Sequence, residues 1–600
     1  MNVPFITNHL TVQNLINCYV KETGNGDWKE ASEVPIPFKA EEPKQIMVIS
    51  FKHQNVTLYV PVRYKSVTER HLFSPFTYYQ YKNEEVKPLD YITLIGFIQK
   101  EFSYNSGNLI QTDELMLRTI LSFQNIKRII AERYTGIAEC YQNDKTFLQS
   151  EQSLLIGHQL HPTPKSRQGI DEDEEAIFAP EHKGAFQLHY FRAANKIVEE
   201  GSALHQDTSM LIKEEIKKDL IVPETFKEKY CQEDGFSLIP VHPLQARKLL
   251  GREDVCQQIQ LGNLSYLGPQ GRKFFPTSSV RTVYHPEATF MYKFSIPVKI
   301  TNSLRVNKRK ELERGVEVSR LLHSGLSDKL AALYPNFRMI QDPAYITVNL
   351  GAEESGFETV VRENPFQEGT DTRTTLLAAL CQDSVGGEYS QLRNVLSKIA
   401  GQEGISLAEA SERWFAAYLK VSLHPMYWLY ATYGIALEAH QQNSIISLNQ
   451  QGYPNIFYYR DNQGYYFMES KAAALRELVP DINEKSDTIC TDSIAEERFR
   501  YYVFFNHLFG LINAFGANSL IDEQTLLARL KKELKFLKKE FGDPTNLLNS
   551  LLHEKVLPCK ANLLTRVHDM DELAGSLETQ SVYVPVKNPL VAMSGVFHEV

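Results

Sequence analysis

Two regions of this chain carry different hydrophobic periodicities, and the contrast limits the folds that it can adopt. Residues 235–305 contain short runs of aromatic and β-branched residues bounded by proline and glycine, which is typical of β-strands. From about residue 375 onward, apolar residues recur at helical spacing, most clearly in 411–433 and 494–515. We therefore expect a chain that is rich in strands at its middle and helical toward its C-terminus.

The length and charge of the chain restrict its class. A chain of 600 residues is too long for one ordinary core, so two to four domains are expected. Its hydrophobic content of 43% is that of a globular protein. The net charge of −9 argues against general nucleic-acid binding, and it leaves any basic cluster to be explained locally.

The cysteines and apolar windows indicate the compartment. Seven cysteines are scattered without a Cys-x-x-Cys pair, which excludes common zinc-ribbon, thioredoxin and ferredoxin patterns and favours a reducing compartment. No basic residue precedes Lys21, so a secretory signal is not expected. Polar residues interrupt the most apolar windows, 421–437 and 499–521, which predicts buried helices, no membrane partner and a cytoplasmic protein.

Four local patterns give further expectations. Residues 47–51 and 56–60 read as a paired β segment, and residues 115–133 read as a helix. A helix over 525–541 would place a leucine stripe on the core and lysines opposite. The acidic run 171–175 is expected to be a solvated face.

A basic segment between Gly157 and Gly169 is the most distinctive local feature of the chain. It holds two imidazoles, two cations and two prolines: His158, His161, Lys165, Arg167, Pro162 and Pro164. Because proline fixes φ and favours extended neighbours, we expect an extended loop that presents positive charge. Such a loop suits an anionic ligand, although a basic surface turn would have the same composition.

A second basic region occupies residues 272–314, with ten Lys/Arg against three acids. Within it, residues 277–282 combine four hydroxyls with an arginine, and both groups hydrogen-bond phosphate oxygens. A basic surface hairpin is an alternative for residues 308–310, which are expected to start a helix. A surface hairpin explains Lys293 and Arg305 less well, because these residues lie among apolar residues and would need anionic partners if buried.

A third polar cluster follows the apolar run 421–437. If residues 437–443 are helical, Glu438 lies near Gln441 and Asn443, with His440 on a neighbouring edge. This pattern suggests that a buried helix opens into a cleft.

A turn at residues 459–464 adds Asp461 to that cluster. Glu438 and Asp461 could hold Mg²⁺, which prefers one or two carboxylates together with substrate phosphates and waters. Alternatively, Glu438 forms a helix-end salt bridge and Asp461 only shapes the turn. The P-loop, dinucleotide, Gly-x-Ser-x-Gly and His-Glu-x-x-His motifs do not occur, so a nucleotide would need a different binding arrangement.

Taken together, these motifs resemble those of the NRPS-independent siderophore (NIS) synthetases of the IucA/IucC family, over essentially the full chain. The matching motifs are His158-Gln-Leu-His-Pro-Thr-Pro-Lys165, Ile239-Pro-Val-His-Pro-Leu-Gln245, Thr277-Ser-Ser-Val-Arg-Thr282, Lys299-Ile-Thr-Asn-Ser-Leu-Arg305, Glu438-Ala-His-Gln-Gln-Asn443 and Tyr459-Arg-Asp-Asn-Gln-Gly464. Residues 559–566 resemble the family's ferric-reductase-like C-terminal region. Residues 17–24, 165–170 and 499–502 resemble most closely the branch that joins spermidine to citrate in the petrobactin pathway.

The resemblance implies an architecture. It is α+β and shaped like a cupped hand, with mixed antiparallel sheets and a helix-rich C-terminal palm. Carried onto this chain, residues 1–150 form the thumb, 151–375 the fingers with the ATP-phosphate motifs, and 376–600 the palm. Members of the family are commonly dimeric, so a homodimer is expected.

The resemblance also implies an activity and its residues. ATP and Mg²⁺ activate a citrate carboxylate as an acyl-adenylate, and an amine or hydroxyl then attacks. The implied nucleotide-binding residues are Ser278, Ser279, Arg281, Thr282, Lys293, Arg305, His440, Gln441 and Asn443. Glu438 and Asp461 are the implied metal ligands. Catalysis is assigned to His161 and Lys165, on a mobile loop over the cleft, together with Arg305 and His440. Under this assignment, Lys165→Ala impairs adenylate formation without affecting the fold, and His158 is structural.

Three alternatives remain open from the sequence. The same activation could serve another amine (a diamine, or a lysine or ornithine derivative) or another carboxylate. A ferric-siderophore reductase would call for a cysteine cluster, whereas Cys559 stands alone. A protein-kinase-like phosphotransferase is disfavoured, because the sequence has neither a glycine-rich loop nor a His-Arg-Asp loop.

Overall fold

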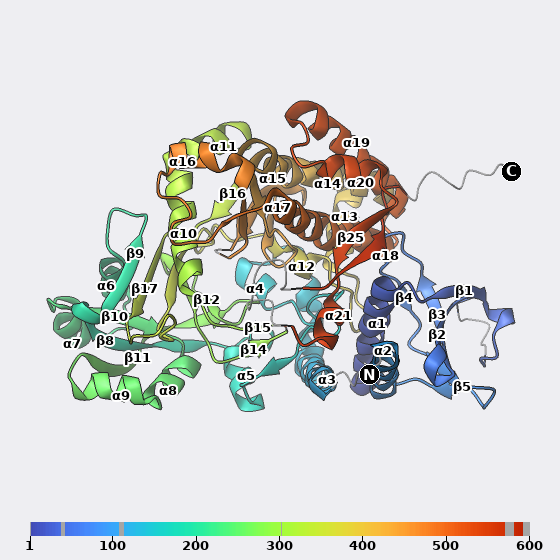
Figure 1. Ribbon diagram of the computed structural model, residues 1–600, viewed down its shortest axis with the longest axis horizontal. Helices are drawn as coiled ribbons and strands as arrows, with labels where there is room; N and C mark the ends of the chain where they lie inside the picture. The colour runs from blue at the N-terminus through green and yellow to red at the C-terminus, as the bar shows by residue number, and fades with distance from the viewer. Residues whose placement is uncertain are drawn as a thin grey trace.

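The structure is a computed structural model. It describes residues 2–37, 43–106, 113–301, 303–461, 463–570 and 581–591. Within these residues helices alternate with sheets whose strands pair mostly antiparallel, which confirms the α+β expectation. The N-terminal part, the central sheet and the C-terminal helices occupy different regions of the molecule (Figure 1). The division at residues 150 and 375 stays a prediction.

The N-terminal part packs helices against a sheet. Strands β2 (Gln45–Phe51) and β3 (Val56–Tyr64) pair antiparallel, with Phe51 opposite Val56, which confirms the expected β segment. Helix α1 (Val3–Thr23) contributes Leu15 and Ile16 to the core beneath them. The expected helix over 115–133 is α3 (Asp113–Arg133).

The middle of the chain forms an eight-stranded sheet in which all neighbours are antiparallel. Its order is β10 (Phe236–Val241), β8 (Phe186–Ala194), β11 (Leu264–Pro276), β12 (Thr282–Tyr284), β13 (Phe290–Phe294), β18 (Thr359–Glu363), β17 (Ala344–Val348) and β9 (Val198–Ser202). Most of the buried aromatic and β-branched residues of these strands belong to one core, whereas Tyr284, Tyr345 and Val360 pack in two smaller clusters. The sheet places residue 281 just before β12 and residue 293 on β13.

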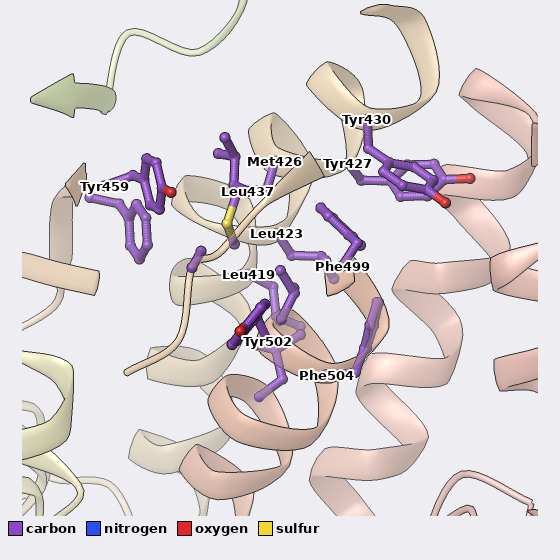
Figure 2. Close-up of a cluster of buried hydrophobic side chains, with 14 of the residues drawn as sticks. Leu419, Leu423, Met426, Tyr427, Tyr430, Leu437, Tyr459, Phe499, Tyr502 and Phe504 are labelled. Atoms are coloured by element: carbon purple, nitrogen blue, oxygen red, sulfur yellow. The ribbon is translucent and has the colours of Figure 1, made fainter. Parts of the chain in front are cut away.

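The C-terminal part is helical around the largest core of the described chain. Helix α14 (Leu407–Val421) and α15 (Leu423–Trp428) pack against α17 (Asp492–Phe499), the π-helical segment η10 (Arg500–Leu508) and α18 (Phe509–Ala517). Figure 2 shows a buried cluster there that includes Leu419, Leu423, Met426, Phe499 and Phe504. Helix α19 (Glu523–Phe541) buries Leu527, Leu530, Leu534 and Leu537, as its stripe predicted.

The apolar windows 421–437 and 499–521 therefore belong to this core, as expected. A search of the described helices finds none with both the length and the apolarity that a membrane crossing requires.

One predicted element is wrong. Residues 438–443 form a loop between strand β20 (Ile435–Leu437) and strand β21 (Ser444–Leu448), not a helix. The cause lies at Gly434, whose φ of 70° ends the preceding helical segment at Tyr433. The chain then continues as β20, which pairs with β23 (Tyr465–Met468).

Candidate functional site

A cavity of about 370 Å³ lies where five of the six sequence motifs meet, and the sixth, residues 239–245, does not line it. Residues from the segments 154–167, 277–314, 438–466 and 498–581 line it. The cavity brings together every candidate residue that the sequence suggested, namely His161, Lys165, Ser278, Ser279, Arg281, Thr282, Lys293, Arg305, Glu438, His440, Gln441, Asn443 and Asp461. Asn302 and Asn462, which belong to two of the motifs, lie outside the described residues.

The lining of this cavity is strongly basic, although the chain carries a net charge of −9. Among the described residues, four that line the cavity are acidic: Glu311, Glu438, Asp461 and Asp487. Twelve are lysines or arginines: Lys165, Arg167, Arg281, Lys293, Arg305, Lys308, Lys310, Arg314, Arg362, Arg460, Arg498 and Lys560. This excess makes the cavity a site for a polyanion.

The hydroxyl-rich segment 277–282 is a tight turn between β11 and β12. Its ends are joined by a hydrogen bond from the Thr277 N–H to the Thr282 carbonyl (2.8 Å). The Ser279 hydroxyl accepts a bond from the Thr282 N–H (3.1 Å), and Val280 has a φ of 66°. The Ser278 hydroxyl accepts bonds from Arg460 and Gln442, both at 3.3 Å. The turn is thereby fixed against the segments that follow β20 and β21.

Two buried cations lie in this turn and on the neighbouring strand β13. The Arg281 guanidinium donates to Asn307 Oδ1 (3.1 Å) and to Gln463 Oε1 (2.9 Å). Burial, and then repulsion from Arg305, lowers the pKa of Arg281 to about 10. The Lys293 ammonium lies 3.1 Å from Asp461 Oδ1, and burial lowers its pKa to about 8. Both side chains are held in place before any ligand arrives.

The loop 438–443 presents a neutral imidazole. Nδ1 of His440 accepts the backbone N–H groups of Gln442 (3.2 Å) and Asn443 (3.3 Å), which assigns the ring proton to Nε2. Burial lowers the pKa of His440 to about 4. Nε2 lies 3.7 Å from Glu438 Oε1, and the Tyr466 hydroxyl donates to the other oxygen of Glu438 (3.1 Å). His440 can therefore donate one hydrogen bond without adding charge.

Glu438 and Asp461 differ in their electrostatic environment. Burial, and then repulsion from Asp461, raises the pKa of Glu438 to about 7. Burial alone would also raise the pKa of Asp461, but Lys293 and Arg362 hold it well below its usual range. The Asn443 amide donates to Asp461 Oδ2 and to the Glu438 carbonyl, each at 3.2 Å, and so links the two positions.

The carboxylates of Glu438 and Asp461 suit Mg²⁺ better than a metal ion whose ligands all come from the protein. No group of three or more His, Cys, Asp or Glu side chains in the described chain is placed to hold a metal ion. Mg²⁺ needs only one or two carboxylates when phosphates and waters complete its shell.

The structure corrects the view of segment 157–169 as a loop that presents positive charge. Lys165 is 5% exposed, and its ammonium donates to Glu181 and to the Leu154 carbonyl (2.6 Å). Arg167 forms two hydrogen bonds with the same carboxylate (2.8 and 2.9 Å). The loop does line the cavity, but a buried carboxylate that follows it in the sequence compensates both charges.

The acidic run 171–175 is also only partly a solvated face. Asp171, Glu172 and Asp173 are exposed, as expected. Glu175 is 2% exposed and accepts hydrogen bonds from Asn125 (3.0 Å) and Arg128. The reason is that helix α5 (Glu172–Phe178) turns this carboxylate inward, toward the cations of α3 and of the basic loop.

Two histidines of the basic segment lie at the cavity wall. His161 is 5% exposed, and its Nδ1 accepts the Thr163 N–H (3.1 Å). Nδ1 of His158 accepts the Leu160 N–H (3.0 Å), and its Nε2 contacts Asn506. His161 thus shares the wall of the cavity with the other candidate residues, and His158 connects the loop to η10.

Sequence reasoning missed a set of residues from the C-terminal part. Arg498, Tyr501, Tyr502 and Lys560 all line the cavity. Arg498 donates to the Tyr583 hydroxyl (3.0 Å), and the Lys560 ammonium lies 5.7 Å from the Tyr501 ring centre. Lys560 carried a local signal, as the one charged residue within 556–565, whereas Arg498 carried none, since it lies among Glu496, Glu497 and Arg500.

The chain is similar over nearly its full length to curated proteins and to a solved structure. The IucA / IucC family model matches residues 146–382, and a model described as Ferric iron reductase FhuF-like transporter matches residues 412–575. A spermidine-citrate ligase of Bacillus anthracis is 46% identical over 98% of both chains. The rhizobactin siderophore biosynthesis protein RhbC of Rhizobium meliloti is 34% identical over 97% of both. The structure of ATP-bound aerobactin synthetase IucA of Klebsiella pneumoniae superposes with a TM-score of 0.87 at 26% identity, covering 97% of this chain and all of that one.

Proposed function

We propose that this chain, which belongs to the IucA/IucC family, is an ATP-dependent ligase that joins a carboxylate of citrate to an amine of spermidine. The observation that carries the proposal is the basic cavity in which five of the six sequence motifs meet. The name of the relative with 46% identity supports the choice of citrate and spermidine. The ATP bound to the similar aerobactin synthetase supports ATP as the second anion.

In the first half-reaction, a citrate carboxylate attacks the α-phosphate of ATP, which gives an acyl-adenylate and pyrophosphate. Two anions must approach each other, so catalysis consists mainly of charge neutralisation and positioning. Arg281, Lys293 and Arg305 provide fixed positive charge. The turn 277–282 and the amide of Gln441 provide hydrogen-bond donors, and His440 donates from Nε2.

Glu438 and Asp461 would hold Mg²⁺ in this proposal. When bound, the ion would neutralise charge on the phosphate oxygens. The chain's own contribution is to keep Asp461 ionised through Lys293 and Arg362 and to link both carboxylates through Asn443.

Arg498 and Lys560 provide positive charge for the remaining carboxylates of citrate, because both line the cavity beside Tyr501 and Tyr502. In the second half-reaction the attacking amine must be neutral, whereas the distal amines of a polyamine stay protonated. We also expect a homodimer in the cytoplasm, where ATP and citrate are available.

Product analysis tests this function. Purified protein is incubated with ATP, Mg²⁺ and citrate, and with spermidine, a diamine, or a hydroxylated lysine or ornithine derivative. Mass spectrometry should find the citryl-spermidine amide, with AMP released in equal amount. An amide formed only with another amine would leave the activation intact but overturn the choice of spermidine. Release of ADP in place of AMP would contradict an acyl-adenylate intermediate.

A second candidate is a ferric-siderophore reductase, because the FhuF-like model matches residues 412–575. Iron–sulfur reductases use clustered cysteine ligands. In this chain Cys559 and Cys490 are buried, as are four of the other five cysteines, at scattered positions. Iron content and visible absorbance of purified protein distinguish the two functions, since a 2Fe–2S spectrum would favour the reductase.

A further inference from the structure

Several buried cations around the cavity are each paired with a carboxylate. Lys293 lies 3.1 Å from Asp461, Arg362 lies 2.6 Å from Asp342, and Arg460 lies 2.7 Å from Glu151. Arg281 and Arg314 are as buried, at 3% and 8% exposure. Among the described residues, however, neither of these two forms an ion pair with a carboxylate.

Both guanidinium groups are held by neutral oxygens instead. Arg281 donates to the side-chain amides of Asn307 and Gln463, at 3.1 and 2.9 Å. Arg314 donates to the Thr488 hydroxyl (3.1 Å) and to three backbone carbonyls, those of Gln463 (2.7 Å), Ser486 (3.0 Å) and Asp487 (3.0 Å). Their orientation is therefore fixed without a carboxylate in direct contact, and for Arg281 the nearest opposing charges, Glu311 and Asp461, act only from a distance.

Gln463 is the residue that both arginines share. It lies in the turn between β22 (Pro454–Arg460) and β23, and all four of its polar groups are used. Its Oε1 accepts from Arg281 and its carbonyl from Arg314, its N–H donates to Asp461 Oδ1 (3.1 Å), and its Nε2 donates to Glu311 Oε2 (2.5 Å).

We propose that Gln463 is a positioning residue that fixes Arg281 and Arg314 through neutral oxygens and so keeps their charge available to the anion in the cavity. A carboxylate side chain at this position would orient Arg281 but would also neutralise it, whereas the backbone carbonyl that holds Arg314 would be unchanged. Burying two guanidinium groups without paired carboxylates costs free energy in the unliganded protein, and an anionic ligand recovers it on binding. The inference rests on the proposed function only for the identity of that anion, ATP.

The contact with Glu311 explains why an amide, and not an acid, is required. The Gln463 amide donates to a carboxylate that is 5% exposed. In Gln463→Glu, two carboxylates would face and repel each other in place of this hydrogen bond. The defect of this variant should therefore exceed that of an uncharged side chain of similar volume, a difference that loss of packing alone would not produce.

The test measures ATP binding to the full chain by calorimetry at pH 8.5. In Gln463→Met, which keeps the volume and removes the side-chain hydrogen bonds, affinity should fall about tenfold. In Gln463→Glu, which places a negative charge beside Arg281, it should fall about a hundredfold, whereas binding of uncharged adenosine should stay unchanged in both variants. Gln451→Glu, at an exposed position, is the matched control and should bind as wild type.

Two outcomes overturn the inference. The first is wild-type ATP affinity of Gln463→Glu, and the second is an equal loss of ATP affinity in Gln463→Glu and Gln463→Met. If the wild type itself does not bind ATP, the proposed function fails. Inorganic pyrophosphate then replaces ATP as the probe of the two arginines, with the same expected order of affinities.

Discussion

At the scale of single residues, the role of a buried cation in the cavity depends on which carboxylate compensates its charge. Lys165 and Lys293 both line the cavity and are both buried, yet their partners differ. Glu181 lies deep in the wall and is shared with Arg167, whereas Asp461 lies on the turn that carries Gln463. The identity and number of these cations could be predicted from the sequence. Their compensation could not, because the carboxylate partners come from distant segments.

Lys165→Ala should destabilise the protein, in contrast to the expectation from the sequence that the fold would be unaffected. Glu181 would keep only Arg167 as a partner. Removing one partner of a buried ion pair costs about 3–5 kcal/mol, and the remaining Arg167 should keep the loss below that range. Denaturant unfolding measures the loss. Adding Glu181→Gln to Lys165→Ala should restore part of it, and a double variant less stable than the single one would contradict this reading.

His507 should make the stability of the protein fall in mild acid. Its Nδ1 donates to the Ala439 carbonyl (2.7 Å), and burial lowers its pKa from 6.5 to about 4. Above pH 6.5 the ring is neutral in both states, so its contribution is fully present. Between pH 6.5 and about 4 only the unfolded chain takes up the proton, and the free energy of unfolding falls by about 1.4 kcal/mol per pH unit.

Unfolding midpoints at pH 8, 6 and 5 measure this effect. His507→Gln should be less stable at pH 8 but should lose less stability on acidification than the wild type. The exposed His323→Gln is the control and should follow the wild type throughout. An unchanged pH slope in His507→Gln would contradict the assignment.

At the scale of elements, the sequence predicted long helices and paired strands well and the site loops poorly. The stripe of α19 and the β2–β3 pair depend on periodicity within one element, which a sequence displays directly. The loop 438–443 depends on a contact between elements. Its preceding strand β20 exists because β23, about thirty residues later, pairs with it. The left-handed Gly434 was the one local signal that the helix ends early.

Gly464 should control how closely the two carboxylate-bearing segments approach. A Cβ at this position would lie 2.5 Å from the Glu438 Cβ and 2.7 Å from the Tyr459 hydroxyl. Gly464→Ala must therefore push Glu438 away from Asp461, and ligase turnover should fall at least about tenfold, since small displacements at a reacting centre are costly.

Gly401→Ala is the matched control for that variant. Gly401 lies in helix α13 (Gln391–Glu403), where a Cβ would meet no atom within 4 Å. It should leave turnover unchanged and raise stability by about 0.5–1 kcal/mol. Equal turnover in the two alanine variants would contradict the role given to Gly464.

At the scale of the whole molecule, a chain of net charge −9 concentrates positive charge in one cavity. Three regions of sequence that fold into different cores provide its walls. The sequence indicates two basic segments and one cluster of acidic and amide side chains. Only the folded molecule shows that these segments line the same cavity and that Arg498 and Lys560 line it as well.

Binding of ATP should therefore weaken as salt is added. The screening length falls from about 10 Å at 0.1 M to about 3 Å at 1 M, so the attraction of the cavity for a polyanion decreases. Titrations across this range should show at least a tenfold loss of ATP affinity. Adenosine, which is uncharged, serves as the control ligand, and an equal salt effect on both ligands would contradict an electrostatic origin.

Citrate-dependent exchange of labelled pyrophosphate into ATP tests the central claim most directly. The reaction reports reversible acyl-adenylate formation and needs no amine. With ATP and Mg²⁺ present, exchange should require citrate, and Arg281→Ala should reduce it at least about a hundredfold because a fixed cation at the phosphates is lost. Exchange without citrate, or no exchange with it, would contradict the account.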